Sequence, residues 1–279
     1  MKKLTLSQAE RETRRLDRST LETAIELVKT NGYIVFDKVI DGSLIKEIRK
    51  SFDPLFDEYV AKKGFNTGAN RAQMYLPFVQ PFIHEDIITH PLVMPILSSI
   101  LGDGLRCAYL ASDTPLPDSD YQNVHCDVMP LFPEVSVSLP SYALVVNIPL
   151  IDVNKENGPL EIWPGGTHLN PEWAVHDTQD GSVNPHLDIV RAAKYMPSEK
   201  VYMPAGSIVI RDIRVWHRGT PNCSQNRRTN IALIYTRHWY GAGGEIQIPQ
   251  DTYDLLSKPA RALFRKEKLG SPVKMPWDW

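Results

Sequence analysis

The chain has 279 residues and a formal net charge of −2, with 42% hydrophobic and 23% charged residues. This length and composition predict one large or two small globular domains that bury a core without cross-links. The near-neutral charge gives no electrostatic basis for binding nucleic acid or an anionic membrane surface. The sequence has no apolar run of about 18 residues, so we expect no membrane-spanning helix.

The N-terminal segment and the cysteines indicate in which cellular compartment the protein is expected. Residues 1–18 are charged and lack the apolar stretch of a signal peptide. Cys107, Cys126 and Cys223 form no CxxC pair and no even-numbered disulfide framework. We therefore expect a reducing compartment, the cytoplasm.

The first hundred residues predict helices and one short strand. Ser19 and Glu22 have capping-box spacing, apolar residues follow at helical intervals, and Gly32 is placed to end the helix. Tyr33–Phe36 then predicts a strand. Two further helices are predicted from apolar stripes, over 44–52 and 91–101.

From residue 105 onward, short strands alternate with turns. Strands are predicted over 105–111, 142–148, 160–163, 200–202, 207–211 and 230–239. Gly- and Pro-rich turns between them favour a mainly β fold with flanking helices, in which a double-sheet jelly roll (a cupin-like, double-stranded β-helix) forms the core. We expect a single domain over 1–279, with a helical part over about 1–104, the core over about 105–240 and a tail over 241–279. The long, poorly periodic stretch 170–199 is interpreted as an insertion beside the mouth of the barrel.

His125 and Asp127 form the first part of a predicted metal site. Residues two apart in an extended chain point to the same side, so both side chains can reach one ion. Two histidines and one carboxylate are a ligand set suited to iron(II), and they leave coordination positions open for an oxoacid and O2. On its own this pair is weak, because a surface turn with an incidental histidine has the same pattern.

A second histidine and an anion clamp follow downstream. His217 lies at the turn-rich end of an apolar strand, and Arg228 follows eleven residues later at the start of the next strand. A guanidinium there can hold a distal carboxylate in a bidentate manner. His168 is a candidate outer partner of the metal ligands, because such ligands usually have oriented neighbours. Cys126, between the two ligands, is expected to point away as a small buried residue.

The pattern resembles the phytanoyl-CoA dioxygenase (PhyH-like) family of Fe(II)/2-oxoglutarate-dependent oxygenases over residues 20–240. In that family an H-x-D motif is followed some ninety residues later by H-x-G-x-x-N-x-S and then by an arginine. The matching positions are His125, Asp127, His217, Gly219, Asn222, Ser224 and Arg228. Family members also have an N-G-P-L segment leading to P-G-S-H, which stands here as residues 157–160 and 164–168, with Gly166 and Thr167 in place of the tight Gly-Ser.

The resemblance implies a cofactor, a co-substrate and a set of roles. Iron(II) would be held by the three ligands, and 2-oxoglutarate and O2 would be co-substrates. Arg228 resembles the anchor of the distal carboxylate of 2-oxoglutarate, and Thr167 resembles the hydroxyl that assists it. Gln122 resembles a residue that hydrogen-bonds the C1 carboxylate. Arg227 is the rival of Arg228, but neighbours on a strand face opposite sides and the family spacing favours Arg228.

Substrate contacts are the least defined. The segment before the barrel and the residues after the motif supply candidates, namely Asn70, Arg71, Met74, Tyr75, Met129, Leu131 and Trp239. For each of them plain packing is at least as good an explanation. Their apolar and aromatic character favours a small organic molecule of medium size.

The resemblance therefore implies a dioxygenase that oxidises an unactivated C–H bond of a small metabolite by hydroxylation, desaturation or cyclisation, as in natural-product biosynthesis. One alternative is a metal-dependent hydrolase or isomerase on a cupin-like barrel, in which zinc activates water. Arg228 argues against it, because such chemistry needs no carboxylate clamp. A catalytically silent jelly-roll binding protein would require all three ligands to be coincidental. The expected partner is a small molecule rather than a nucleic acid or membrane, and the sequence leaves the oligomeric state open, with a homodimer among the options.

Overall fold

A computed structural model describes residues 1–128, 131–132, 137–169, 189–241 and 245–279. Within these ranges, no helix is both long enough and apolar enough to cross a membrane.

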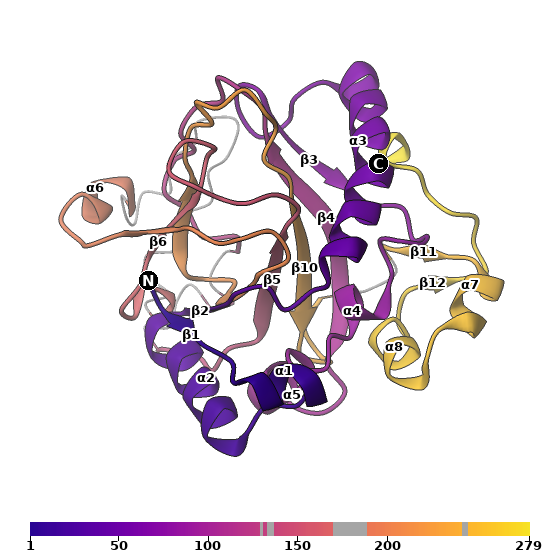
Figure 1. Cartoon of the computed structure of the whole chain (residues 1–279), viewed down its shortest axis with the longest axis horizontal. Coiled ribbons are helices and arrows are strands. Elements are labelled where there is room, and N and C mark those ends of the chain that lie inside the picture. Colours follow the sequence, from indigo (N-terminus) through magenta and orange to yellow (C-terminus); the bar gives the residue numbers. More distant parts are fainter. Residues whose placement is uncertain (129–130, 133–136, 170–188, 242–244) are drawn as a thin grey trace.

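The largest layer is a mixed seven-stranded sheet in the order β1-β2-β8-β5-β10-β4-β3 (Figure 1). Its strands are β1 (Lys3–Leu4), β2 (Tyr33–Phe36), β3 (Arg71–Tyr75), β4 (Arg106–Pro115), β5 (Ala143–Pro149), β8 (Ile208–Asp212) and β10 (Asn230–Thr236). All neighbours pair antiparallel except β1 and β2, which are parallel. Strands from distant parts of the sequence therefore meet in one sheet.

Two smaller sheets complete the strand content of the described residues. A three-stranded sheet has the order β7-β6-β9, with β6 (Leu160–Trp163) between β7 (Glu199–Val201) and β9 (Trp216–Gly219). The short parallel pair β11 (Gln247–Ile248) and β12 (Lys268–Leu269) lies beside the C-terminal helices.

Helices cover the outer face of the large sheet. They are α1 (Gln8–Thr13), α2 (Arg18–Asn31), α3 (Gly42–Lys63), α4 (Glu85–Ile88), α5 (Met94–Leu101) and α8 (Lys258–Leu263). Two helices lie apart: α6 (Ile189–Ala193) near β6, and α7 (Gln250–Leu255) beside β11 and β12 (Figure 1). In the part of the chain that the structure describes, two short 3-10 turns span Thr167–Leu169 and Pro276–Asp278. The main hydrophobic core lies between these helices and the sheet, with α2 packed on β2 and β8.

Side-chain alternation divides the sheet into two faces. In β2, Ile34 and Phe36 join the main core, whereas Tyr33 and Val35 pack in a second cluster with Ile162 of β6. This second cluster lies between the large and the three-stranded sheets. The two sheets thus face each other, and the face of the large sheet that is turned away from the helices supplies the interior of the barrel.

The predicted fold class is confirmed, and most predicted strands lie within a few residues of the observed ones. The predicted capping box at Ser19 is wrong, because α2 has Asp17 at its N-cap, whereas Ser7 and Glu10 form a capping box at α1. Gly32 does end α2, with a φ of 82°. The prediction missed β1, β3, β9, β11 and β12. Because β1, β2 and β3 belong to the large sheet, that sheet draws on the segment before residue 105. The 170–199 insertion lies largely outside the described residues; its end contains α6.

Candidate metal centre

The three predicted metal ligands converge on one point. Their candidate ligand atoms all lie within 4.8 Å of one another. Oδ1 of Asp127 is 3.3 Å from Nε2 of His217 and 3.8 Å from Nε2 of His125. One ion can therefore contact all three side chains, as the two-histidine, one-carboxylate arrangement requires.

Backbone pairing brings the two histidines together. His125 and His217 exchange both backbone hydrogen bonds, of 3.0 and 2.9 Å, so the loop that contains His125 runs as an added strand beside β9. Their ring centroids are 4.4 Å apart. The backbone N–H of Asp127 donates to Ile213, which fixes the loop again two residues later.

Each imidazole is oriented by a carbonyl two residues before it. Nδ1 of His125 lies 2.8 Å from the carbonyl oxygen of Asn123, and Nδ1 of His217 lies 2.9 Å from that of Val215. A carbonyl oxygen only accepts hydrogen bonds, so both Nδ1 atoms are assigned the proton. The lone pairs of both Nε2 atoms are then directed at the shared ion, as in established metal sites.

Arg211 of β8 completes the surroundings of Asp127. Its Nη1 lies 2.7 Å from Oδ2 of Asp127, and its Nε donates to Oδ1 of Asn147 at 3.2 Å. Arg211 is only 6% exposed. Arg211 thus pairs with Oδ2 of Asp127, while Oδ1 is turned toward the two histidines.

The electrostatic setting keeps the ligands ready for a metal. Burial raises the pKa of Asp127, but Arg211 and His217 together hold it well below its usual range. Burial, followed by the neighbouring His217, lowers the pKa of His125 to about 4. At neutral pH, Asp127 is therefore ionised and His125 is neutral, which are the forms that bind a metal.

A cavity of about 260 Å³ is lined by all three ligands and by Arg228. Its other walls include Asn147, Asn230 and Asp113, which face inward from β5, β10 and β4. Arg228 is buried, and its Nε and Nη2 both donate to the carbonyl of Gly158, at 3.0 and 2.7 Å. Burial lowers the pKa of Arg228 to about 10, so it stays cationic at neutral pH.

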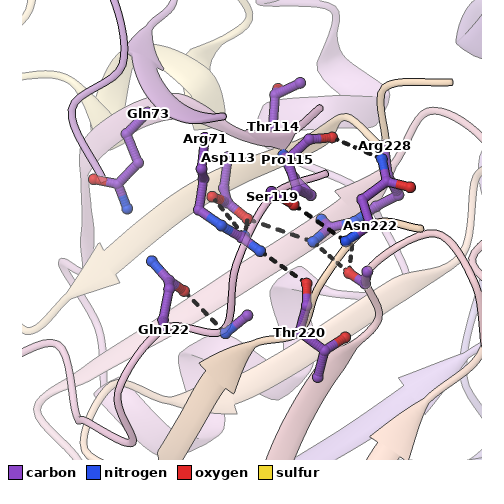
Figure 2. Close-up of polar contacts among 12 residues, drawn as sticks. Arg71, Gln73, Asp113, Thr114, Pro115, Ser119, Gln122, Thr220, Asn222 and Arg228 are labelled. Carbon is purple, nitrogen blue, oxygen red and sulfur yellow. Dashed lines mark hydrogen bonds and ion pairs between the residues drawn. The ribbon is translucent and has the colours of Figure 1, made fainter. Parts of the chain in front are cut away.

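The Asn-Gly-Pro turn and the Asn-x-Ser motif both shape the surroundings of Arg228. Gly158 has a φ of +78°, and a Cβ there would lie 3.0 Å from the carbonyl oxygen of Thr220, so glycine suits this close approach. Asn222 donates to the carbonyl of Pro115 (Figure 2). It also donates to the carbonyl of Asn226 and accepts from the Ser224 hydroxyl, and these contacts hold the turn before Arg228.

A second, more open cavity of about 740 Å³ adjoins the first. The two share Gln73, Gln122, His125 and Asp127 in their walls. Oε1 of Gln122 accepts from the backbone N–H of Gly219 at 2.9 Å (Figure 2). This contact fixes the amide, so its Nε2 is the end that can donate to a ligand.

Several predicted residues lie elsewhere in the structure. The hydroxyl of Thr167 donates to the carbonyl of Trp163 at 2.6 Å and accepts from the backbone N–H of Trp216, so it links β6 to β9 outside the described cavity walls. Nε2 of His168 lies 2.9 Å from the carbonyl of Lys29, so His168 is bonded to the end of α2 rather than to a metal ligand. Cys126 donates to the carbonyl of Val128, away from the ligands.

The candidate substrate residues are also dispersed. Met74 belongs to the main core, and Tyr75 stacks on Trp279 with centroids 4.1 Å apart. Leu131 packs near Tyr142, and Trp239 is 54% exposed beside Tyr142 and Tyr240. Asn70 donates to the carbonyls of Pro117 and Asp118. Arg71 is 1% exposed and ion-paired with Asp113, and Met129 lies outside the described residues.

Sequence reasoning missed Arg211, Asn147 and Asp113. Each is a polar residue within a strand whose other members are largely apolar, and two of them contact each other across β5 and β8. A buried charge or amide requires a partner, so a lone arginine in Ile208–Asp212 was the available sign of a functional interior.

Comparison with known proteins agrees with this geometry. The model of the family "Phytanoyl-CoA dioxygenase (PhyH)" matches residues 28–230. Dioxygenase af480 of Aspergillus fumigatus is 25% identical over 214 residues, which cover 74% of this chain and 62% of that protein. The chain therefore spans less than two thirds of that relative's length.

Solved structures share the fold. The non-haem alpha-ketoglutarate-dependent epimerase SnoN from nogalamycin biosynthesis matches with a TM-score of 0.59 and 20% identity, over 79% of this chain and 82% of that one. The corresponding carbocyclase SnoK matches with a TM-score of 0.58 and 21% identity, over 80% and 85%. SnoN in complex with Fe3+, alpha ketoglutarate and nogalamycin RO gives a TM-score of 0.60 at 20% identity, over 79% and 85%. Because the family model spans most of the sequence, the chain belongs to the phytanoyl-CoA dioxygenase family.

Proposed function

We propose that this chain is a non-haem iron(II) dioxygenase that uses 2-oxoglutarate and O2 to oxidise an unactivated C–H bond of a small organic metabolite. The observation that supports this most is a single cavity lined both by the metal-ligand triad and by buried Arg228. A metal site alone fits several activities, whereas a cation in the same cavity fits a chelating oxoacid with a second carboxylate.

The donor set fits iron, and each residue has a role in this proposal. His125 and His217 would bind the ion through Nε2, and Asp127 would bind through Oδ1. Bound iron(II) would supply O2 activation, coupled to decarboxylation of 2-oxoglutarate to succinate and CO2. Arg228 would hold the distal carboxylate, and Nε2 of Gln122 would donate to the C1 carboxylate. The predicted help from Thr167 finds no support, because its hydroxyl is engaged between β6 and β9.

The organic substrate would occupy the open cavity, which shares its wall with the ligands. The lining of the open cavity also includes Phe65, Tyr121 and Asp120, so it offers aromatic surface and one carboxylate besides that of the ligand Asp127. The relatives described as an epimerase and a carbocyclase from nogalamycin biosynthesis support a natural product as the substrate class. Hydroxylation, desaturation and cyclisation all fit a site whose role is to oxidise a nearby C–H bond. The single-domain organisation and the cytoplasmic location stay predictions.

A metal-dependent hydrolase or isomerase on this barrel is the rival function. Zinc at the same ligands could activate water. Hydrolysis gives no reason to place a buried guanidinium in the same cavity, where desolvating it is unfavourable. Arg228 therefore favours the oxygenase.

The test is the metal dependence of 2-oxoglutarate binding and turnover. We expect calorimetric binding of 2-oxoglutarate to the metal-loaded protein, and succinate and CO2 release that requires both iron(II) and 2-oxoglutarate. His217→Ala should abolish turnover, whereas His238→Ala, which removes an exposed histidine, should not. The proposal would be overturned if turnover persisted in His217→Ala, or if the wild-type protein neither bound nor converted 2-oxoglutarate.

A further inference from the structure

Two buried arginines share one carboxylate beside the metal cavity. Nη1 of Arg71 lies 3.3 Å from Oδ1 and 3.1 Å from Oδ2 of Asp113. Nη2 of Arg228 lies 3.6 Å from Oδ2 of the same residue (Figure 2). Arg71 and Arg228 are 1% and 4% exposed, and Asp113 is their shared ion-pair partner among the described residues.

Arg71 is held in a fixed position by two further contacts. Its Nη2 donates to the carbonyl of Thr220 at 3.0 Å. Its guanidinium lies against Gly219, where an added Cβ would be 2.5 Å from Cζ, Nη1 and Nη2 of Arg71. Only a residue without a side chain leaves room for this approach, two positions after the ligand His217. Arg71 thus lies behind the cavity wall, which Gly219 and Asp113 form.

The charges around the cavity explain why a second arginine is needed. Asp113 lines the cavity with a 24% exposed side chain, so an entering carboxylate meets it as well as Arg228. Arg228 and Asp113 alone would be a neutral pair with little net attraction for an anion. With Arg71 the cluster has two cations and one anion, and one positive charge remains for the ligand.

We propose that Arg71 is a positioning residue for 2-oxoglutarate: it neutralises and holds Asp113, so that Arg228 keeps its attraction for the distal carboxylate of a 2-oxo dicarboxylate. The inference rests on the proposed function and extends it to a residue that lies outside the cavity. It also assigns Asp113 a purpose, which is to hold Arg228 in place while the site is empty of ligand. Selectivity for a dicarboxylic oxoacid is then a property of the three-residue cluster rather than of Arg228 alone.

Charge-balancing variants test this directly. Arg71→Gln removes the cation and leaves Asp113 ionised beside Arg228. The double variant Arg71→Gln/Asp113→Asn removes both charges and restores the net charge of the cluster. Arg227→Gln is the matched control, because Arg227 is adjacent to Arg228 but turns outward to Asp57, at 2.6 Å. The measurement is calorimetric affinity of the Mn(II)-loaded protein for 2-oxoglutarate and for 2-oxopentanoate, which has a methyl group in place of the distal carboxylate.

Arg71→Gln should weaken 2-oxoglutarate binding by about tenfold or more, since Arg228 and Asp113 are then a neutral pair with little net attraction for the distal carboxylate. It should leave 2-oxopentanoate binding unchanged, because that ligand has no distal charge. The double variant should recover most of the lost affinity, and Arg227→Gln should match the wild type. If Arg71 served only to pack the fold, the second substitution, Asp113→Asn, would not restore the affinity for 2-oxoglutarate that is lost in Arg71→Gln.

Other results overturn the inference. These are an equal loss for both oxoacids in Arg71→Gln, or a double variant that binds 2-oxoglutarate no better than the single one. If Arg71→Gln does not fold, Asp113→Asn decides: the inference expects it to bind 2-oxoglutarate at least as tightly as the wild type, and tenfold weaker binding refutes it. Wild-type protein that fails to bind 2-oxoglutarate at all would refute the proposed function instead.

Discussion

Arg211 is joined to the metal ligand Asp127 by an ion pair of 2.7 Å, and this contact links the large sheet to the loop that supplies two of the three ligands. Arg211 is in turn bonded to Asn147 on the neighbouring strand β5. The loop is also fixed by backbone pairing with β9, on the opposite sheet, and by the backbone hydrogen bond from Asp127 to Ile213. The metal site is therefore held from both sheets, with Arg211 as the contact from the larger one.

Removing Arg211 should weaken metal binding. Arg211→Gln leaves Oδ2 of Asp127 without its cation, so the carboxylate loses both its orientation and its low pKa. Loss of an outer partner lowers metal affinity by roughly 10- to 100-fold. Titration of the apoprotein with Co(II) or Mn(II) measures this change. Arg218→Gln is the control, because Arg218 is adjacent to His217 but pairs with Glu161. Unaltered metal affinity in Arg211→Gln would mean that the backbone hydrogen bonds of the loop to His217 and Ile213 position Asp127 without Arg211.

Substitution of Arg228 should weaken binding of the co-substrate 2-oxoglutarate far more than binding of the metal. Arg228→Lys keeps the charge but cannot reproduce the two hydrogen bonds to Gly158 or a bidentate grip on a carboxylate. We expect the KM for 2-oxoglutarate to rise by on the order of a hundredfold with a smaller change in kcat, because the contact is remote from the reacting atoms. Steady-state kinetics with varied 2-oxoglutarate measures both constants. A variant that loses kcat with its KM unchanged would place Arg228 in another role.

The sequence predicts those parts of the site in which the residues are close together along the chain. The H-x-D motif places His125 and Asp127 on one side of an extended segment, and the structure keeps that geometry. The same alternation separates Arg228 from Arg227, which faces α3 and pairs with Asp57. These relationships need only local backbone geometry and the motif spacing.

The remainder depends on pairing between distant strands, which local patterns do not encode. The strand β3 is short and mixes polar with apolar residues, so it gave no strand prediction. Its alternation is clear only against β4: Arg71 and Gln73 face the barrel, and Ala72 and Met74 join the core. The role of Arg71 as the partner of Asp113 follows from that pairing, whereas the sequence suggested a substrate contact.

A side chain at position 219 should have the same effect on 2-oxoglutarate binding as the loss of Arg71. Gly219→Ala places a Cβ about 2.5 Å from the Arg71 guanidinium, which must then move from Asp113 or from Thr220. We expect weaker 2-oxoglutarate binding, measured by calorimetry, with metal affinity retained because His217 lies two residues away on a paired strand. Gly42→Ala is a suitable control, since an added Cβ there meets open space. Normal 2-oxoglutarate binding in Gly219→Ala would show that Arg71 can shift without consequence.

Stability at low pH should depend on Glu10, which is far from the site in the N-terminal capping box. Its carboxylate accepts from the backbone N–H groups of Ser7 and Asp17, at 2.8 and 3.0 Å, and from the Ser7 hydroxyl. Burial raises the pKa of Glu10, but these hydrogen bonds outweigh it and lower the pKa from 4.5 to about 2. A pKa that is depressed in the folded state stabilises the fold above the unfolded value, and this stabilisation is lost as the pH falls from about 4.5 toward 2.

Glu10→Gln lacks this titration, so the difference in unfolding free energy between wild type and variant should be constant above about pH 5 and shrink below pH 4.5. Urea unfolding of both proteins over pH 3–7 measures that difference, and titration of every other group cancels in the comparison. Gln8→Ala is the control, because Gln8 is an exposed residue of the same helix that bonds only to the neighbouring Glu12 among the described residues. A difference that stays constant down to pH 3 would mean that Glu10 titrates alike in the folded and unfolded chains, and its hydrogen bonds would then contribute no acid-sensitive stability.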